Sequence, residues 1–90
     1  MDRAIITVLG AVRVGIIAAV STYLAEKNVN IMDISQTTMQ DIFTMIMMVD
    51  TSNSNESFDV LHADFKKMSE ELGVKIQIQA AEIFNSMHKI

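Results

Sequence analysis

The chain contains no cysteine, has no excess of positive charge and lacks any long apolar run. Without cysteine, disulfide bonds and thiolate metal sites are excluded. The formal net charge of −4 gives no electrostatic footprint for binding a nucleic-acid backbone. No apolar run reaches the roughly 18 residues that a membrane span needs, and no signal peptide is evident. We therefore expect a cytoplasmic chain with no nucleic-acid partner and no membrane partner.

Hydrophobic spacing divides the 90 residues into elements in the order β-α-β-β-α-β, within a single domain over residues 1–90. Alternating or β-branched apolar runs predict strands over residues 3–9, 42–50 and 74–79, and residues 30–40 are predicted as a second, more polar strand. Apolar positions three and four apart predict helices over residues 14–27 and 58–72. We expect Asn28 and Gly73 to end these helices, and Asn53 with Glu56 has the spacing of a capping box. An apolar stripe predicts a short C-terminal helix carrying Ile83, Phe84, Met87 and Ile90.

This order is typical of an α+β, ferredoxin-like βαββαβ sandwich, in which two helices cover one face of an antiparallel four-stranded sheet. Right-handed crossovers place strands 3–9 and 42–50 in the middle, in agreement with their apolar character on both faces. One apolar face of strand 42–50 must then point away from the helices, which is unusual for a soluble monomer. The tail helix, a second copy or both could cover it. Together with the polar edge strand 30–40, this patch favours a homodimer or larger assembly.

The candidate site is the turn between the first strand and the first helix, which consists of Gly10, Ala11, Val12, Arg13, Val14 and Gly15. The first N–H groups of a helix have no intrahelical partner and can bind an anionic group. The two glycines either only shape the turn or allow a ligand to approach the backbone closely. Asn30 is expected to lie next to this turn, where its amide could both donate and accept hydrogen bonds. The alternative for Asn30 is that it only marks the helix exit.

No set of residues has the spacing of a catalytic or metal site. Gly10 and Gly15 are spaced as in a phosphate-binding P-loop, but Ile16 and Ile17 stand where that motif needs Lys and Ser/Thr. We interpret the two histidines, His62 and His88, as solvated or satisfied side chains.

An acylphosphatase-type enzyme shares the element order and remains the enzymatic alternative. Arg13 and Asn30 could take its arginine and asparagine roles, but the rest of the loop does not match. We therefore expect no enzyme activity, no metal and no cofactor.

Several stretches together resemble the ACT domain, a small regulatory fold that binds amino acids in many metabolic enzymes. They are the turn at residues 10–15, Val14-Gly15-Ile16-Ile17, Leu24-Ala25-Glu26 and Asn28-Val29-Asn30-Ile31. The resemblance covers essentially the whole chain and is greatest to small stand-alone ACT proteins. The chain is also similar to the ACT modules of the glycine-cleavage-system repressor and of formyltetrahydrofolate deformylase.

The resemblance implies a homodimer that holds a ligand between the turn of one subunit and strand or helix residues of its neighbour. Carried over by position, the ligand contacts are residues 10–15, Asn30 and Ile31. The family's turn often reads Asp/Asn-Arg-Pro-Gly, whereas this chain has Val12-Arg13-Val14-Gly15. If position 12 caps the first helix, Val12→Asp should stabilise that helix by about 0.5–2 kcal/mol.

The function that follows is a non-catalytic regulatory module that binds a small metabolite, with amino acids as the expected class. The alternative is a protein-interaction or assembly module whose ligand site is degenerate.

Overall fold

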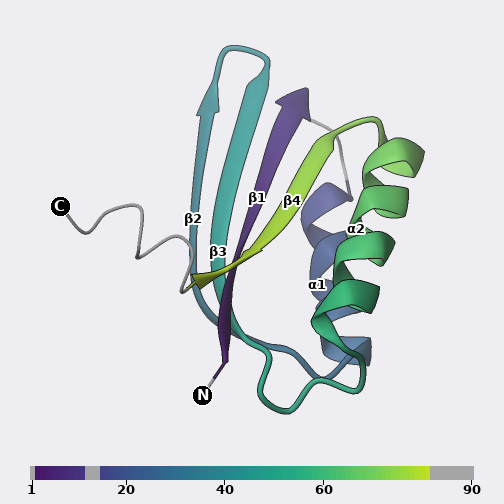
Figure 1. Ribbon diagram of the computed structural model, residues 1–90. Helices are drawn as coiled ribbons and strands as arrows, with labels where there is room; N and C mark the ends of the chain where they lie inside the picture. Colours follow the sequence, from purple (N-terminus) through teal and green to yellow (C-terminus); the bar gives the residue numbers. More distant parts are fainter. Residues whose placement is uncertain (1, 12–14, 82–90) are drawn as a thin grey trace, which may run out of the picture.

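The computed structural model describes residues 2–11 and 15–81, which form one sheet with two helices (Figure 1). The strands are β1 (Arg3–Ala11), β2 (Asn30–Met39), β3 (Ile42–Asp50) and β4 (Lys75–Ala80), and the helices are α1 (Ile16–Glu26) and α2 (Phe58–Leu72). All six elements were predicted, with bounds that differ by no more than two residues. The expected C-terminal helix lies outside the described residues.

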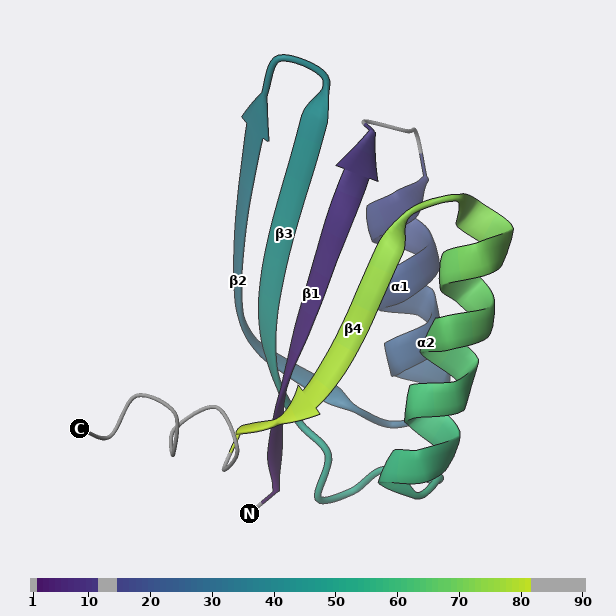
Figure 2. The ribbon, with the colours of Figure 1, turned by 45° about the horizontal axis from the view of Figure 1, so that its top comes forward.

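The sheet has the strand order β2-β3-β1-β4, and all neighbouring strands are antiparallel. Both helices lie on one face of the sheet, as Figures 1 and 2 show from two directions. The ferredoxin-like α+β fold is therefore confirmed, with β1 and β3 in the centre and the polar β2 at an edge. Because α1 returns the chain across the sheet, β1 and β2 begin at the same end: Arg3 and Asn30 both pair with Asp50.

The core lies between the sheet and the helices. Alternate residues of the two central strands point into it and are buried: Ala4, Ile6, Val8, Phe43, Met45, Met47 and Val49. The helices contribute Val20, Leu24, Leu61 and Phe65. Met45 and Met47 are thus core-filling side chains, as expected from their place in a central strand.

Tyr23 of α1 connects the two helices. Its ring packs edge-on against Phe65 of α2, with 4.9 Å between the ring centroids. Its hydroxyl donates a hydrogen bond to Asp64 Oδ2 at 2.5 Å. Burial, reinforced by the hydrogen bond to the neighbouring Asp64 carboxylate, raises the pKa of the Tyr23 phenol above its ordinary value.

The helix ends follow the predictions in part. Asn28 (φ 60°) and Gly73 (φ 70°) adopt left-handed conformations after the two helices, as expected. The prediction that Asn53 and Glu56 form a capping box is wrong. Ser57 is the N-cap of α2, and its hydroxyl accepts a hydrogen bond from the Val60 N–H. The loop therefore continues past Asn53 before the helix begins at Phe58.

Candidate functional site

The turn that was predicted as the site leaves the sheet at Ala11 and enters α1 at Ile16. Gly15 is the N-cap of α1, with φ 93°, a left-handed conformation that glycine adopts without steric cost. Its carbonyl accepts the first helical hydrogen bond, from the Ala19 N–H at 2.8 Å. Val12, Arg13 and Val14 lie outside the described residues.

The assignment of position 12 as the helix cap is wrong, because the N-cap is Gly15, three residues later. Gly15 has no side chain that could accept a hydrogen bond, and the first turn of α1 contains no acidic residue. Stabilisation of α1 by Val12→Asp as a cap is therefore no longer expected. The N-cap side chain therefore gives the first N–H groups of α1 no hydrogen bond, and N–H groups at such a position can bind an anionic group.

Gly10 and Gly15 are glycine for different structural reasons. A Cβ built on Gly10 would lie 2.7 Å from Val74 Cγ1, so the close approach at Gly10 is made by the protein itself. At Gly15 a Cβ would meet no atom within 4 Å. Gly10 is therefore explained by packing, whereas Gly15 borders open space in which a ligand could approach the backbone.

Asn30 does not lie next to this turn within one chain, contrary to the prediction. Ala11 pairs with Ile42 at one end of β3, and Asn30 pairs with Asp50 at the other end. These positions on β3 are eight residues apart, which corresponds to about 26 Å. The prediction overlooked that β1 and β2 are parallel, so that β2 starts where β1 starts. Asn30 is exposed, while Ile31 is half-buried against the core.

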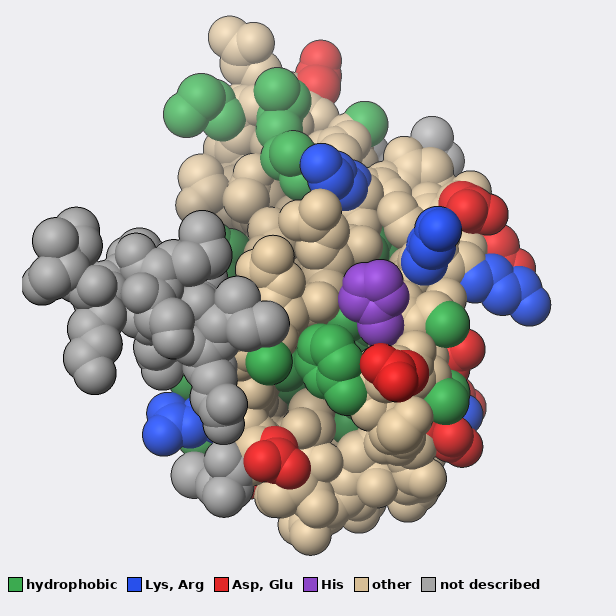
Figure 3. Space-filling model, in the orientation of Figure 1, with side chains coloured by type: hydrophobic (Ala, Val, Ile, Leu, Met, Phe, Trp, Pro, Cys, Tyr) green, Lys and Arg blue, Asp and Glu red, His purple; other side chains and the backbone are tan. Residues whose placement is uncertain are grey.

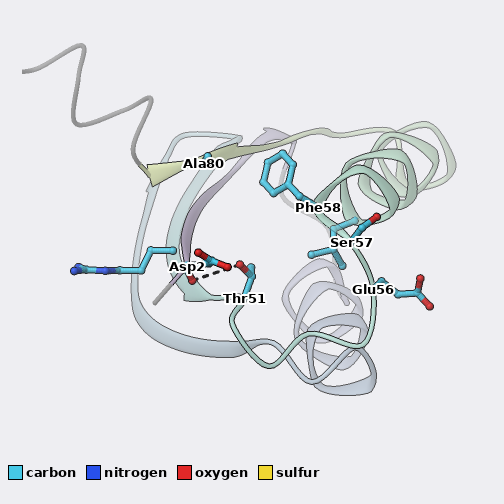
Figure 4. A pocket seen from close by; sticks show the side chains of 8 residues that line it. Asp2, Thr51, Glu56, Ser57, Phe58 and Ala80 are labelled. Atoms are coloured by element: carbon cyan, nitrogen blue, oxygen red, sulfur yellow. Dashed lines mark hydrogen bonds between the residues drawn. The ribbon is translucent and has the colours of Figure 1, made fainter.

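Sequence reasoning missed a cavity of about 340 Å³ at the end of the sheet opposite the turn. In Figure 4, Asp2 and Thr51 lie on one side of it, and Phe58 and Ala80 lie on another. The complete lining is Asp2, Arg3, Thr51, Glu56, Ser57, Phe58, Leu61 and Ala80. These residues come from separate parts of the chain, and no local motif could have grouped them.

Hydrogen bonds organise the chain beside this cavity. The Thr51 N–H donates to the Asp2 carbonyl oxygen at 2.8 Å. The hydroxyl and the N–H of Ser52 donate to Asp50 Oδ1 at 2.7 and 2.9 Å, and these bonds hold the pKa of the Asp50 carboxyl below its ordinary value. The polar groups thus fix the β3–α2 loop against the start of β1.

Within residues 2–11 and 15–81, no three His, Cys, Asp or Glu side chains come together as a metal site would require. His62 is exposed on α2, and His88 lies outside these ranges. No helix in the same ranges is long and apolar enough to cross a membrane.

A sequence model of the ACT domain matches residues 2–79. The chain belongs to the ACT domain family. This ACT domain is 52% identical to a UPF0237 protein of Listeria monocytogenes over 98% of the chain and 99% of that relative. The expected resemblance to small stand-alone ACT proteins is therefore confirmed.

Solved structures agree with this assignment. An ACT domain protein from Streptococcus pneumoniae is 44% identical, superposes with a TM-score of 0.81 and shares 92% of this chain and 93% of its own. A formyltetrahydrofolate deformylase from Pseudomonas syringae has a TM-score of 0.81 at 24% identity, with 89% of this chain matching 28% of that one, and shows a shared fold alone. ACT domains are regulatory ligand-binding modules, and the family is regulatory rather than catalytic.

Proposed function

We propose that this ACT domain is a homodimeric regulatory module that binds a small metabolite of the amino-acid class. The ligand lies between residues 10–15 of one subunit and Asn30 and Ile31 of the other. The observation that carries the proposal is the separation of these two halves by about 26 Å within one chain. A site that needs both halves must take them from two copies.

The outer surface of α1 supports such pairing because it carries no charge before Glu26. Its exposed residues are Ile17, Ala18, Thr22 and Ala25. The exposed surface of α2, in contrast, carries Asp59, Lys66, Lys67, Glu70 and Glu71. A small, uncharged helix surface can pack against its own copy without desolvating charges.

The neighbouring edge of the sheet has the same character. β2 is an edge strand, and only Asp33 in it is charged. Met32 and Ile34 of this strand are exposed apolar side chains, as is Ile17 of α1. An unpaired edge beside apolar residues is a surface that a second chain can extend or cover.

A two-fold axis beside β2 and perpendicular to the sheet would place the two β2 strands and the two α1 helices antiparallel. The beginning of α1 in one subunit would then face the end of α1 and the beginning of β2 in the other. This arrangement is isologous, so it creates two identical composite sites. Each site contains Gly15 from one copy and Asn30 from its partner.

The chemistry of the composite site suits an amino acid. The first N–H groups of α1 would bind the carboxylate. The Asn30 side chain would accept a hydrogen bond from the ammonium group through its oxygen and donate another through its nitrogen. Recognition rests on the backbone, Arg13 and Asn30, because Ala11 and Val12 have no polar side-chain atoms.

A thermal-shift screen of the common amino acids at millimolar concentration tests the ligand class. Saturating ligand stabilises the folded state by RT ln(1 + [L]/Kd), or about 2.7 kcal/mol at one hundred times Kd. We expect at least one amino acid to raise the melting temperature of the native protein and not of Asn30→Ala. Asn53→Ala, which changes another exposed amide, serves as the control. Unchanged melting temperatures throughout the screen would contradict amino-acid binding.

Subunit mixing tests whether the site is shared between copies. Arg13→Ala and Asn30→Ala should each lose ligand binding when assayed alone. In a mixed dimer one of the two sites has both residues intact, and random mixing makes about half of all dimers mixed. Mixing the two variants should therefore restore about one quarter of the binding capacity. Failure to restore binding in proven mixed dimers would show that each site lies within one chain.

The proposed interface is tested by Ile34→Lys on β2, with Val60→Lys on the exposed side of α2 as the matched control. Light scattering should give a dimer mass for the native protein and the control, and a monomer mass for Ile34→Lys. Dimers that persist in Ile34→Lys would place the interface elsewhere.

A second candidate is an assembly module without a ligand, and the apolar Ala11 and Val12 in the turn favour it. It predicts a stable dimer, no response to any amino acid, and specific capture of a purified metabolic enzyme or repressor. The cytoplasmic location expected from the sequence applies to both candidates.

A further inference from the structure

Strand β4 forms the edge of the sheet opposite β2, and among the described residues it pairs only with β1. The direction of its outer backbone groups follows from one hydrogen bond. The Ile76 N–H donates to the Ser69 hydroxyl of α2 at 3.2 Å, and so points away from β1. In an antiparallel pair, inward and outward backbone groups alternate along the strand. The N–H and C=O of Ile78 therefore also point outward, where an added strand can pair with them.

A cavity of about 200 Å³ lies between this edge and α2. Phe65, Ile76 and Ile78 give it an apolar lining, and α2 adds the exposed side chains of His62 and Lys66. In Figure 3, the purple histidine lies close to blue Lys or Arg side chains on the surface where β4 and α2 meet. Of the described residues, no Asp or Glu lines this cavity, although the chain has a net charge of −4. The β4 edge is thus locally suited to an acidic ligand.

His62 and Lys66 have the spacing of alternate residues in an extended chain. They are four residues apart in α2, which corresponds to about 6 Å along the helix axis. Side chains two residues apart on one face of a strand are separated by about 6.8 Å. Paired residues point to the same side of a sheet, so an added residue opposite Ile78 points toward the helices, as Ile78 does. A carboxylate at that position and another two residues away would each meet one of the two side chains.

A second copy of this chain does not fit the β4 edge. Two β4 strands paired about a two-fold axis would bring Lys66 of both subunits to one seam, where like charges oppose pairing. The β2 strand of a second copy offers no carboxylate on the required side. Its one charged residue, Asp33, pairs with Met48 and points away from the helices. The charges on this edge therefore favour a different protein segment.

We propose that the β4 edge binds an extended segment of a partner protein that carries acidic residues at alternate positions. The segment adds to β4 as a further strand, and its main chain pairs with the outward N–H and C=O of Ile78. Two of its carboxylates accept hydrogen bonds from Lys66 and His62, which select the acidic residues. Because β4 is the edge farthest from β2, this inference does not depend on the proposed dimer or its ligand.

Synthetic peptides test the charge pattern. The probe is a fluorescein-labelled octapeptide of alternating Glu and Thr, and its binding to the native protein is measured by fluorescence anisotropy. The control peptide has the same composition in the order Glu-Glu-Thr-Thr-Glu-Glu-Thr-Thr, in which no two Glu residues are two positions apart. We expect saturable binding of the alternating peptide and several-fold weaker binding of the control. No saturable binding, or equal binding of both peptides, would overturn the proposal.

Charge reversal and amide exchange locate the bound peptide. Lys66→Glu changes a residue that lines the cavity, and Lys67→Glu is the matched control, since Lys67 is exposed on α2 outside the lining. We expect Lys66→Glu to weaken binding of the alternating peptide several-fold and Lys67→Glu to have little effect. In hydrogen exchange followed by NMR, the peptide should slow exchange of the Ile78 amide and not that of β2 amides. Equal effects of the two variants, or protection of β2 in place of Ile78, would also overturn the proposal.

Discussion

Val74 packs against the backbone of Gly10, with its Cγ1 atom 2.7 Å from the position that a Cβ on Gly10 would occupy. Gly10→Ala must therefore displace Val74 and the β4 segment that follows it. We expect the free energy of unfolding to fall by about 1–3 kcal/mol, as for other overpacked sites. Denaturant unfolding at one fixed protein concentration measures the change.

The double variant Gly10→Ala with Val74→Ala is the control for this contact. Because the smaller side chain removes the clash, the double variant should lose less stability than the sum of the two single variants. Additive losses would show that Gly10 is required for another reason.

Substitutions of Gly15 test the backbone conformation of the turn without a packing effect, because a Cβ there would meet no atom within 4 Å. At φ 93°, Gly15→Ala should cost about 1–2 kcal/mol. Gly15→Asn should cost less, since asparagine tolerates left-handed conformations better than alanine does. Equal unfolding free energies for both variants and the native protein would mean that the turn adopts another conformation.

Ser57 and Asn53 distinguish the observed helix cap from the predicted one. Ser57→Ala removes the hydroxyl that accepts from the Val60 N–H and should lower stability by about 0.5–2 kcal/mol. Asn53→Ala should change stability by less than about 0.5 kcal/mol, as an exposed substitution outside the cap. The reverse ranking in thermal unfolding would restore Asn53 as the cap.

The lowered pKa of Asp50 predicts that the stability of the fold depends on pH in the acidic range. Its pKa is lowered by the hydroxyl and N–H of Ser52, so these bonds favour the folded state above the unfolded pKa. This contribution is lost as the pH falls below about 4 and through the folded pKa. A carboxyl ¹³C NMR titration should show a higher Asp50 pKa in Ser52→Ala than in the native protein. Ser54→Ala is the control and should leave the Asp50 titration unchanged.

The raised pKa of Tyr23 predicts that stability is lost as the pH rises in the alkaline range. Burial and the Asp64 carboxylate raise its pKa, so the folded state holds the phenol proton more tightly than the unfolded state does. The Tyr23 contribution to stability is therefore complete below pH of about 10 and is lost as the pH rises above that value. Tyr23→Phe should flatten the decline in unfolding free energy in this range. An unchanged decline would exclude Tyr23 as its cause.

Much of the fold could be predicted because local patterns determine it. Strand β3 is apolar on both faces, and this pattern placed it in the centre of the sheet. The spacing from Phe58 to Leu72, followed by Gly73, predicted α2 with its bounds. These signals depend on hydrophobic periodicity and on glycine at a helix end, which neighbouring residues alone reveal.

The candidate site was predicted less well. The position of Gly15 at the beginning of α1 was evident, but Asn30 lies at the other end of the sheet. That error came from the direction of β2, since a β-α-β crossover returns the chain to the end where β1 begins. The cap of α1 was misplaced because the alignment with the family's turn pointed to position 12, whereas the helical hydrogen bonds begin at Gly15.

The element order, the ACT family and the likeness to stand-alone members follow from local sequence patterns, because each depends on residues close together in the chain. The packing of Val74 against Gly10 and the separation of Gly15 from Asn30 became evident from the folded chain alone. It also grouped Asp2, Thr51 and Phe58 around one cavity. Such contacts join residues far apart in the sequence, and their distances depend on strand direction and register, which no local pattern of side chains specifies.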